Sequence, residues 1–279
     1  MRRIVHISDL HFGDEDRDLV DALGHEIAAL EPTLVAVSGE LTQRARRLEF
    51  IAARDFLRSL GVPTVVVPGN HDIPLYNPYR RFFNPTRKFE RYITSDLAPL
   101  YADAEIVVLG VNSARSNVVK EGRISHQQIE SIRRYLGQLG PQALKVVVVH
   151  HPLVHHPDDP GRRLLGRGRE FLEIAQEYGL DLVLAGHTHL GYGGDARASF
   201  ETIERSILVF QAGTATSRSL RGGESNTYNL ITVDNPQLSL TVRAWNGERF
   251  ATEFSIIYER RGNEWLHRHT FRDKPETSA

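Results

Sequence analysis

Residues that can bind a metal ion stand directly after short apolar segments throughout this chain. They are carboxylates, an amide and imidazoles, a mixture that suits Mn, Fe or Zn, whereas Mg and Ca favour oxygen ligands alone. Six of the 13 histidines lie at such positions, which loop composition does not explain, and we therefore predict a metal site. In chain order the polar residues at these positions are Asp9, His11, Glu40, Asn70, His71, Asp72, His150, His151, His187 and His189.

Two pairs among these residues share one spacing. Asp9 and His11 are two residues apart, and so are His187 and His189. In an extended segment such residues point to the same side, so each pair would hold an ion from one side. Either pair alone is common in ordinary loops. The prediction therefore depends on several strand ends meeting at one place.

The apolar pattern predicts an arrangement that brings those ends together. Short β-branched runs alternate with amphipathic segments, which is typical of parallel strands joined by helices, and right-handed crossovers then bring the carboxyl ends of the strands to one edge. We expect strands at 3–8, 34–37, 62–67, 106–111, 145–149 and 180–185, and helices at 18–30, 48–60, 125–139 and 171–178. From residue 206 onward the chain is rich in strands, expected at 207–211, 227–233, 238–245 and 252–258, which would complete the second sheet as antiparallel strands.

Composition limits the classes of function. The 279 residues contain no cysteine, which excludes disulfides and thiolate metal sites. A formal net charge of -1 gives no general attraction to nucleic acid, so we do not expect that partner. The chain has neither a run of 18 apolar residues nor a leader-like start, which predicts a cytoplasmic protein without a transmembrane segment. We expect a single domain at 1–273 and a frayed tail at 274–279.

The number of candidate ligands exceeds what one ion uses. A catalytic ion takes three or four protein ligands, whereas two ions that share a carboxylate fit seven. Two ions about 3.5–4 Å apart with a bridging hydroxide are a recurring means of hydrolysing phosphate esters. The seven candidates are Asp9, His11, Glu40, Asn70, His150, His187 and His189.

The order of these motifs resembles that found in the calcineurin-like metallophosphoesterase superfamily. Its pattern D-x-H, G-D, G-N-H-D, H and G-H-x-H is matched by Asp9-Leu10-His11, Gly39-Glu40, Gly69-Asn70-His71-Asp72, His150 and Gly186-His187-Thr188-His189. The resemblance implies an α/β fold, a four-layer α/β/β/α sandwich of two mixed sheets. It also implies two divalent transition-metal ions, one held by Asp9, His11 and His189 and the other by Asn70, His150 and His187, with position 40 bridging.

The resemblance implies two catalytic residues as well. His71 would donate a proton to the leaving oxygen, and Asp72 would orient the turn or the imidazole. His150 is preferred to His151 as a ligand because the family's ligand is the first residue after the strand.

The chain departs from the family at one position, because it has Glu40 where the bridging residue is normally Asp. The additional methylene would move the carboxylate by more than about 1 Å. We therefore expect Glu40→Asp to raise hydrolysis, and we retain a metal-binding scaffold with little turnover as an alternative function.

Basic residues on irregular segments are candidates for substrate binding. Arg80 and Arg81 lie in a basic, aromatic insertion at 74–100, whose rings either pack on the body or cover a substrate. Arg218 and Arg221 lie in a small, basic loop after the last histidine motif. A further cluster at 162–169 is either a solvated surface or a phosphate site.

The substrate is predicted only as a class. The segments at 6–13 and 68–72 resemble the bacterial cyclic-nucleotide phosphodiesterases most, which implies a phosphodiester or nucleotide-containing substrate. They also resemble UDP-2,3-diacylglucosamine pyrophosphatases, which implies peripheral contact with a membrane if the substrate is a lipid. A DNA end-processing nuclease is a third alternative, disfavoured by the neutral net charge. The oligomeric state is not predicted.

Overall fold

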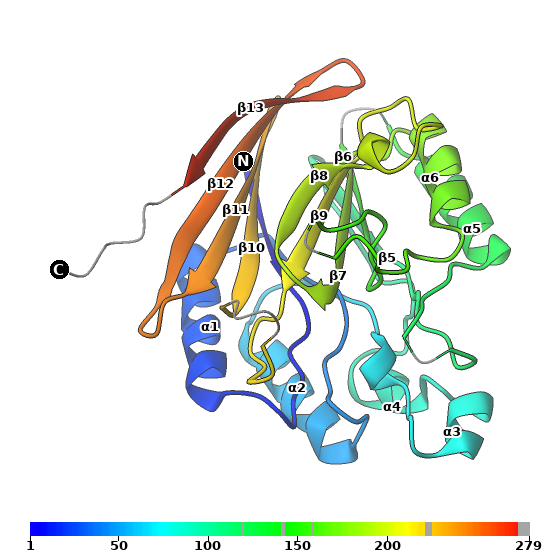
Figure 1. The fold of residues 1–279 in the computed structure, drawn as a ribbon, viewed down its shortest axis with the longest axis vertical. Helices are drawn as coiled ribbons and strands as arrows, with labels where there is room; N and C mark the ends of the chain where they lie inside the picture. Colours follow the sequence, from blue (N-terminus) through cyan, green and yellow to red (C-terminus); the bar gives the residue numbers. More distant parts are fainter. Residues whose placement is uncertain (119, 141–142, 158, 221–224, 273–279) are drawn as a thin grey trace.

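The computed structural model describes residues 1–118, 120–140, 143–157, 159–220 and 225–272. Two mixed sheets face each other, and helices cover their outer faces, so the predicted four-layer sandwich is confirmed (Figure 1). Arg221 and the predicted tail at 274–279 lie outside the described residues. Among the described residues, no helix combines the length and the apolar character needed to cross a membrane.

The first sheet has seven strands in the order β13-β12-β11-β10-β1-β2-β3. Its parallel part is the predicted β-α-β-α-β unit, with β1 paired to β2 and β2 paired to β3. The strands are β1 (Arg2–Ile7), β2 (Leu34–Val37), β3 (Thr64–Val66), β10 (Thr227–Asp234), β11 (Gln237–Trp245), β12 (Phe250–Arg261) and β13 (Glu264–Arg272).

The second sheet has six strands in the order β4-β5-β6-β7-β9-β8. Its centre is parallel, from β5 to β9, and antiparallel β4 and β8 form the edges. The strands are β4 (Leu100–Ala102), β5 (Ile106–Gly110), β6 (Leu144–Val148), β7 (Leu182–His189), β8 (Tyr192–Asp195) and β9 (Leu208–Gly213).

The helices begin and end at residues suited to their termini. The carboxylate of Asp16 accepts hydrogen bonds from the first amides of α1, and its buried Leu19, Leu23 and Ile27 recur at helical spacing. Ser125 caps α5 in the same way. The helices are α1 (Arg17–Leu30), α2 (Arg47–Ser59), α3 (Pro78–Phe83), α4 (Arg87–Tyr92), α5 (His126–Leu136) and α6 (Gly168–Glu177), with single 3-10 turns at Asn70–Asp72 and Ala196–Ala198.

Three apolar cores hold the four layers together. Residues such as Ile4 and Val146 pack between the two sheets. Alternate residues of the first sheet, such as Val5, pack against α1 and α2, and those of the second sheet, such as Val147, pack against α5 and α6. Each central strand is therefore buried on both faces, which fixes the positions of the loops at its carboxyl end.

The placement of the C-terminal strands differs from the prediction. The antiparallel strands extend the first sheet instead of completing the second, because β10 pairs with the open edge of β1, with Ile231 opposite Ile4. Strand β9 does join the second sheet, but it lies parallel to β7.

Three strands were not predicted, and β7 and β12 are longer than expected. β4 has only three residues, β8 contains two glycines, and β13 is polar along most of its length, so none has a clear apolar alternation. Strand β7 continues through the His187-x-His189 motif rather than ending at Ala185.

Candidate metal centre

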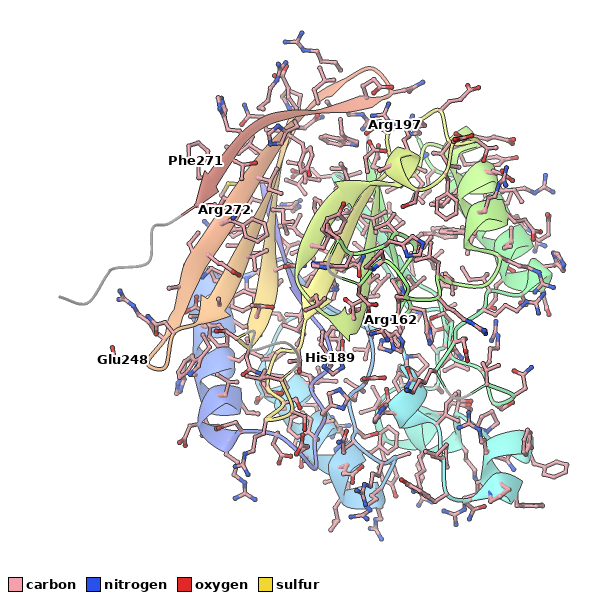
Figure 2. All side chains as sticks on the ribbon, in the orientation of Figure 1. Arg162, His189, Arg197, Glu248, Phe271 and Arg272 are labelled. Carbon is pink, nitrogen blue, oxygen red and sulfur yellow. The ribbon has the colours of Figure 1, made fainter. Side chains whose placement is uncertain are left out.

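All seven predicted ligands meet where the carboxyl ends of the central strands converge. Asp9 and His11 follow β1, Glu40 follows β2, Asn70 follows β3 and His150 follows β6. The two histidines of β7 stand at the end of that strand, and Figure 2 labels His189 there. Two mixed sheets thus deliver ligands from both sides of the sandwich to one place.

Five of the seven side chains stand on left-handed backbone. Positive φ is uncommon for residues other than glycine, and the strain it carries accumulates at functional sites. The segment from Asp9 to His11 is therefore not extended as predicted, and the two side chains converge because each residue turns the chain. The φ angles are 54° for Asp9, 49° for His11, 54° for Glu40, 72° for His187 and 63° for His189.

A first group of ligand atoms comes from Asp9, His11, Glu40 and His189. Their ligand atoms lie within 4.8 Å of one another, and all four side chains are buried. His11 Nε2 lies 3.0 Å from Glu40 Oε2, and His189 Nε2 lies 3.3 Å from Asp9 Oδ1 and 3.7 Å from Glu40 Oε2. The group offers two carboxylates and two imidazoles to a single point.

A second group surrounds the other oxygen of Glu40. His150 Nε2 lies 3.2 Å from Glu40 Oε1, 3.2 Å from Asn70 Oδ1 and 3.2 Å from His187 Nδ1. His187 Nδ1 is itself 3.9 Å from Glu40 Oε1. The Glu40 carboxylate therefore stands between two ligand groups, with one oxygen facing each.

Buried atoms without partners show that these groups fit a cation. Asp9 Oδ1 and His11 Nε2 are buried and make no hydrogen bond, although His11 Nε2 lies close to Glu40. Leaving such atoms unsatisfied costs free energy unless a ligand meets them. Burial alone would raise the pKa of the Glu40 carboxyl, but the charges of His150 and His11 hold it well below its usual value. The donor set thus suits divalent transition metals.

Neighbouring polar groups orient the ligands. His150 Nδ1 donates to Ser38 O at 2.7 Å, which leaves Nε2 free to face Glu40 and Asn70. Asp9 Oδ2 accepts hydrogen bonds from the Ser8 hydroxyl and from the His187 amide. The sequence analysis did not identify Ser8 and Ser38, although each is a small polar residue that directly follows a buried strand and precedes a ligand-bearing turn.

Two glycines permit the loops that carry the ligands to approach one another closely. A Cβ at Gly69 would lie 2.5 Å from both Glu40 Cγ and the Glu40 amide nitrogen. A Cβ at Gly186 would overlap the Ser8 hydroxyl. The G-N-H-D and G-H-x-H motifs therefore need glycine for close approach rather than for an unusual φ angle.

His150 and His151 have different surroundings. His150 faces Glu40 and Asn70, whereas His151 Nδ1 is 2.8 Å from Ser113 Oγ. The His151 ring still lies beside the second group, 4.9 Å from the His187 ring, and its ligand atoms can reach those of His150 and His187. Burial and the charges of His150 and His187 keep the pKa of His151 well below its usual value.

His71 stands at the edge of the centre. Its ring is 5.1 Å from the His11 ring, and Nδ1 donates to Gln43 O at 2.9 Å, which directs Nε2 elsewhere. Asp72 instead accepts hydrogen bonds from the Gly69, Leu41 and Thr42 amides. Of the two roles considered for Asp72, orienting the turn matches these contacts, whereas the His71 imidazole is oriented by Gln43.

The basic residues predicted to bind substrate have different environments. Arg81 is buried, donates to Val118 O and lines a cavity of about 270 Å³ beside Asn70 and His71. Arg80 lines a separate, larger pocket. Arg218 is exposed, on a loop that Ser217 and Ser219 fasten to Asp14.

The cluster at 162–169 is a surface of ion pairs. Each of its four arginines lies near a carboxylate, which matches the solvated alternative rather than a free phosphate site. The pairs are Arg162 with Asp159, Arg163 with Glu121, Arg167 with Glu170 and Arg169 with Glu173.

Comparison with known proteins identifies the family. The family model described as calcineurin-like phosphoesterase matches residues 2–191, which is more than half of the chain. The chain therefore belongs to the calcineurin-like phosphoesterase family, and the resemblance carried by its motifs is confirmed.

Two curated relatives have names that describe phosphodiesterases. A probable cyclic nucleotide phosphodiesterase of Synechococcus is 28% identical over 168 residues, which is 58% of this chain and 59% of that protein. A probable glycerophosphodiester phosphodiesterase of Arcobacter nitrofigilis is 26% identical over 207 residues, which is 67% of this chain and 71% of that protein. The chain thus matches less than two thirds of the length of the first of them.

Solved structures share the fold. A dimetal phosphatase from Danio rerio is 15% identical with a TM-score of 0.62, and the alignment covers 90% of this chain and 98% of that one. A purple acid phosphatase from yellow lupin is 13% identical with a TM-score of 0.66, and the alignment covers 94% of this chain and 54% of that one. At these identities the likeness describes the fold alone.

Proposed function

We propose that this protein is a phosphodiesterase that uses two divalent transition-metal ions, chosen among Mn, Fe and Zn. Asp9, His11 and His189 would hold one ion, and Asn70, His150 and His187 would hold the other, with Glu40 bridging. The observation that carries the proposal is the position of the Glu40 carboxylate, whose two oxygens face separate ligand groups. When bound, the two ions would polarise the phosphoryl oxygens and lower the pKa of the attacking water.

The residues around the metal groups would divide the remaining work. In its doubly protonated form, His71 would give a proton to the leaving oxygen from Nε2, because the Nδ1 proton is held by Gln43 O. Asp72 would act as a positioning residue that joins the loops after β2 and β3. Arg81 would orient an anionic substrate in the cavity beside His71.

A small phosphodiester is the substrate class that we favour. Two relatives are named for hydrolysis of phosphodiesters, one cyclic and one linear. The cavity of about 270 Å³ suits a small group next to the reacting phosphate. Each cleavage of a diester also releases one alkoxide as the leaving group, and the proposed proton donor would protonate it.

A lipid-linked pyrophosphate of the UDP-2,3-diacylglucosamine type is a second candidate. Exposed Leu75 and Tyr76 line the same cavity as His71, so an apolar part of a substrate would find a surface there. Cleavage of such a pyrophosphate would use the same metal groups.

Turnover of two chromogenic substrates would test the proposal. With Mn added, we expect faster hydrolysis of bis(p-nitrophenyl) phosphate than of p-nitrophenyl phosphate, and loss of that activity in Asn70→Ala. Preference for the monoester would reject the diesterase. Activity on neither substrate, with metal bound, would favour the scaffold without turnover.

A further inference from the structure

Large apolar side chains are exposed at one corner of the molecule, formed by residues 74–92 and called here the basic aromatic corner. Among the described residues, five of the ten exposed large hydrophobic side chains lie within it. They are Leu75, Tyr76, Tyr79, Phe82 and Phe83, and the two phenylalanines are 60% and 70% exposed. In Figure 1, α3 and α4 of this corner lie at the lower end of the molecule, the end toward which the β7 arrow points.

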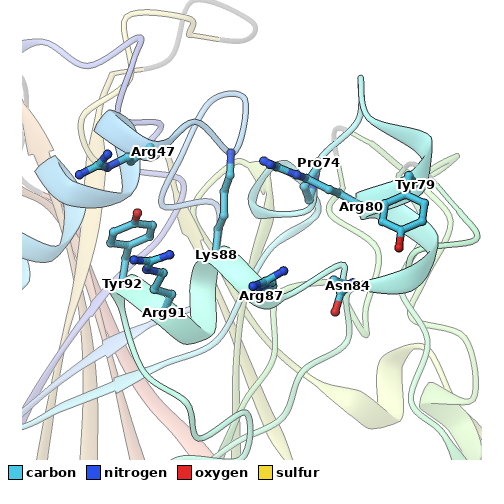
Figure 3. A pocket seen from close by; sticks show the side chains of 9 residues that line it. All are labelled: Arg47, Pro74, Tyr79, Arg80, Asn84, Arg87, Lys88, Arg91 and Tyr92. Carbon is cyan, nitrogen blue, oxygen red and sulfur yellow. The ribbon is translucent and has the colours of Figure 1, made fainter.

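The same corner, together with Arg47 of α2, gathers positive charge. A pocket of about 660 Å³ is lined by four arginines and a lysine, together with Tyr79 and Tyr92, and by no acidic residue (Figure 3). Lys88 donates to Ala45 O, and burial together with the charge of Arg80 lowers its pKa. Within the part of the chain that the structure describes, none of the five cations forms an ion pair. They are Arg47, Arg80, Arg87, Lys88 and Arg91.

The arginines at 162–169 behave differently. All four arginines of the 162–169 cluster lie beside carboxylates. The five cations of the pocket form no ion pair among the described residues, although the Glu49 carboxylate acts on Lys88. Together they raise a positive potential that attracts anions. Phenylalanine rings that are more than half exposed to water form an apolar surface, and covering this surface with a partner lowers the free energy. The corner therefore needs a partner that offers negative charge and an apolar medium together.

We propose that the basic aromatic corner binds the surface of an anionic lipid membrane. The cations of the pocket would meet the lipid phosphates, and Phe82 and Phe83 would enter the boundary between headgroups and acyl chains. Tyr76 and Tyr79 suit the same boundary, because each has an apolar ring and a polar tip.

Two other partners fit less well. A second copy of the chain, docked through the same corner, would place five unpaired cations against five others. Single-stranded nucleic acid stacks its bases on aromatic rings, but its bases do not stack on an exposed aliphatic residue such as Leu75. A lipid interface accepts aliphatic and aromatic side chains alike.

The position of the corner links membrane binding to the metal centre. Pro74 lines the basic pocket, while the adjacent Leu75 and Tyr76 line the cavity that contains Asn70 and His71. A membrane at the corner would therefore lie beside the metal centre. The inference does not rest on the proposed hydrolysis, because vesicle binding is measured without turnover.

Vesicle sedimentation tests the proposal. We expect the full chain to bind vesicles of phosphatidylcholine mixed with phosphatidylglycerol and not vesicles of phosphatidylcholine alone. At about 1 kcal/mol for each cation near the surface, Arg87→Gln with Arg91→Gln should weaken binding about 30-fold. Phe82→Ser with Phe83→Ser should also weaken it, and soluble inorganic pyrophosphate should compete only at much higher concentration than the lipid phosphate.

A matched control comes from the opposite side of the molecule. Phe271 and Arg272 on β13 are an exposed aromatic residue and an exposed arginine that forms no ion pair with the described residues, and both lie far from α3 (Figures 1 and 2). Phe271→Ser with Arg272→Gln should bind vesicles as the unmodified chain does. Unchanged thermal unfolding would show that the corner variants fold.

Several results of the vesicle experiments would overturn the proposal. They are no binding to either vesicle, equal binding to both, equal loss in the control variant, or a dimer that the Phe82 and Phe83 changes dissociate while vesicles stay unbound. Tighter binding to a single-stranded oligonucleotide than to the anionic vesicle would also reject it.

Discussion

Shortening Glu40 by one methylene tests how the two ligand groups are joined. In Glu40→Asp, the carboxylate would retreat by about 1.5 Å, one C–C bond, from both groups. Its oxygens now lie 3.0 Å from His11 Nε2 and 3.2 Å from His150 Nε2. The backbone cannot follow easily, because the Glu40 amide and Cγ already pack closely over Gly69.

This geometry reverses the expectation drawn from the family pattern. We now expect Glu40→Asp to lower hydrolysis, since the turn after β2 places the longer side chain between the groups. Metal–oxygen bonds are about 2.0–2.2 Å long, so a retreat of more than 1 Å would break at least one bridging bond. Misplacement of about 1 Å can cost about 10²-fold in rate, which sets the expected loss in kcat/KM.

The assay is Mn-supported hydrolysis of bis(p-nitrophenyl) phosphate together with metal content per chain. Glu40→Gln serves as the control for charge, because it keeps the length and removes the negative charge. We expect both variants to lose activity and the Asp variant to bind less of one ion. Activity equal to or above that of the unmodified chain in Glu40→Asp, with metal content unchanged, would refute the reasoning.

Three further predictions follow from single contacts. Gly69→Ala should lower stability by about 1–3 kcal/mol in calorimetry and weaken metal binding, because the added Cβ would press on Glu40. Gly140→Ala should show no such loss, because a Cβ at Gly140 would have no atom within 4 Å. His71→Ala should keep its metals, measured by elemental analysis, and lose about 10²–10⁴-fold in kcat; loss of an ion instead would make His71 a ligand. His6 is buried, and desolvation lowers its pKa from 6.5 to about 3. The unfolded chain therefore protonates this histidine below pH 6.5, whereas the folded chain protonates it only near pH 3. His6 should therefore contribute a fall of about 2 kcal/mol in stability from pH 7 to pH 5, so in urea unfolding the stability of His6→Gln should fall by less than that of the unmodified chain or of His25→Gln. Equal slopes in all three would contradict the assignment.

The sequence predicted where the strands end better than it predicted the backbone conformation of the ligand residues. Apolar runs such as the one before Pro68 locate a buried strand, and the motif that follows must then lie at the edge of the sheet. The left-handed conformation of Asp9 and Glu40 has no signal in residue type, because it results from the packing of neighbouring loops. Ser38 was missed because its contribution to the site is a backbone carbonyl, which every residue possesses.

Long-range placement also lay beyond the sequence. The alternation of β10 predicts a strand but not its partner, and the open edge of β1 became available only through the order of the parallel strands. Arginine clusters posed a similar problem. The residues at 162–169 and those at 80–91 look alike in sequence, and only the carboxylates brought near the first group distinguish them.

The most direct test of the central claim is a crystal structure of the Mn-loaded protein with anomalous diffraction at the Mn edge. The account predicts two anomalous peaks about 3.5–4 Å apart. Asp9, His11 and His189 should surround one peak, Asn70, His150 and His187 should surround the other, and one oxygen of Glu40 should bind each. A single peak, or two peaks without Glu40 between them, would contradict the account.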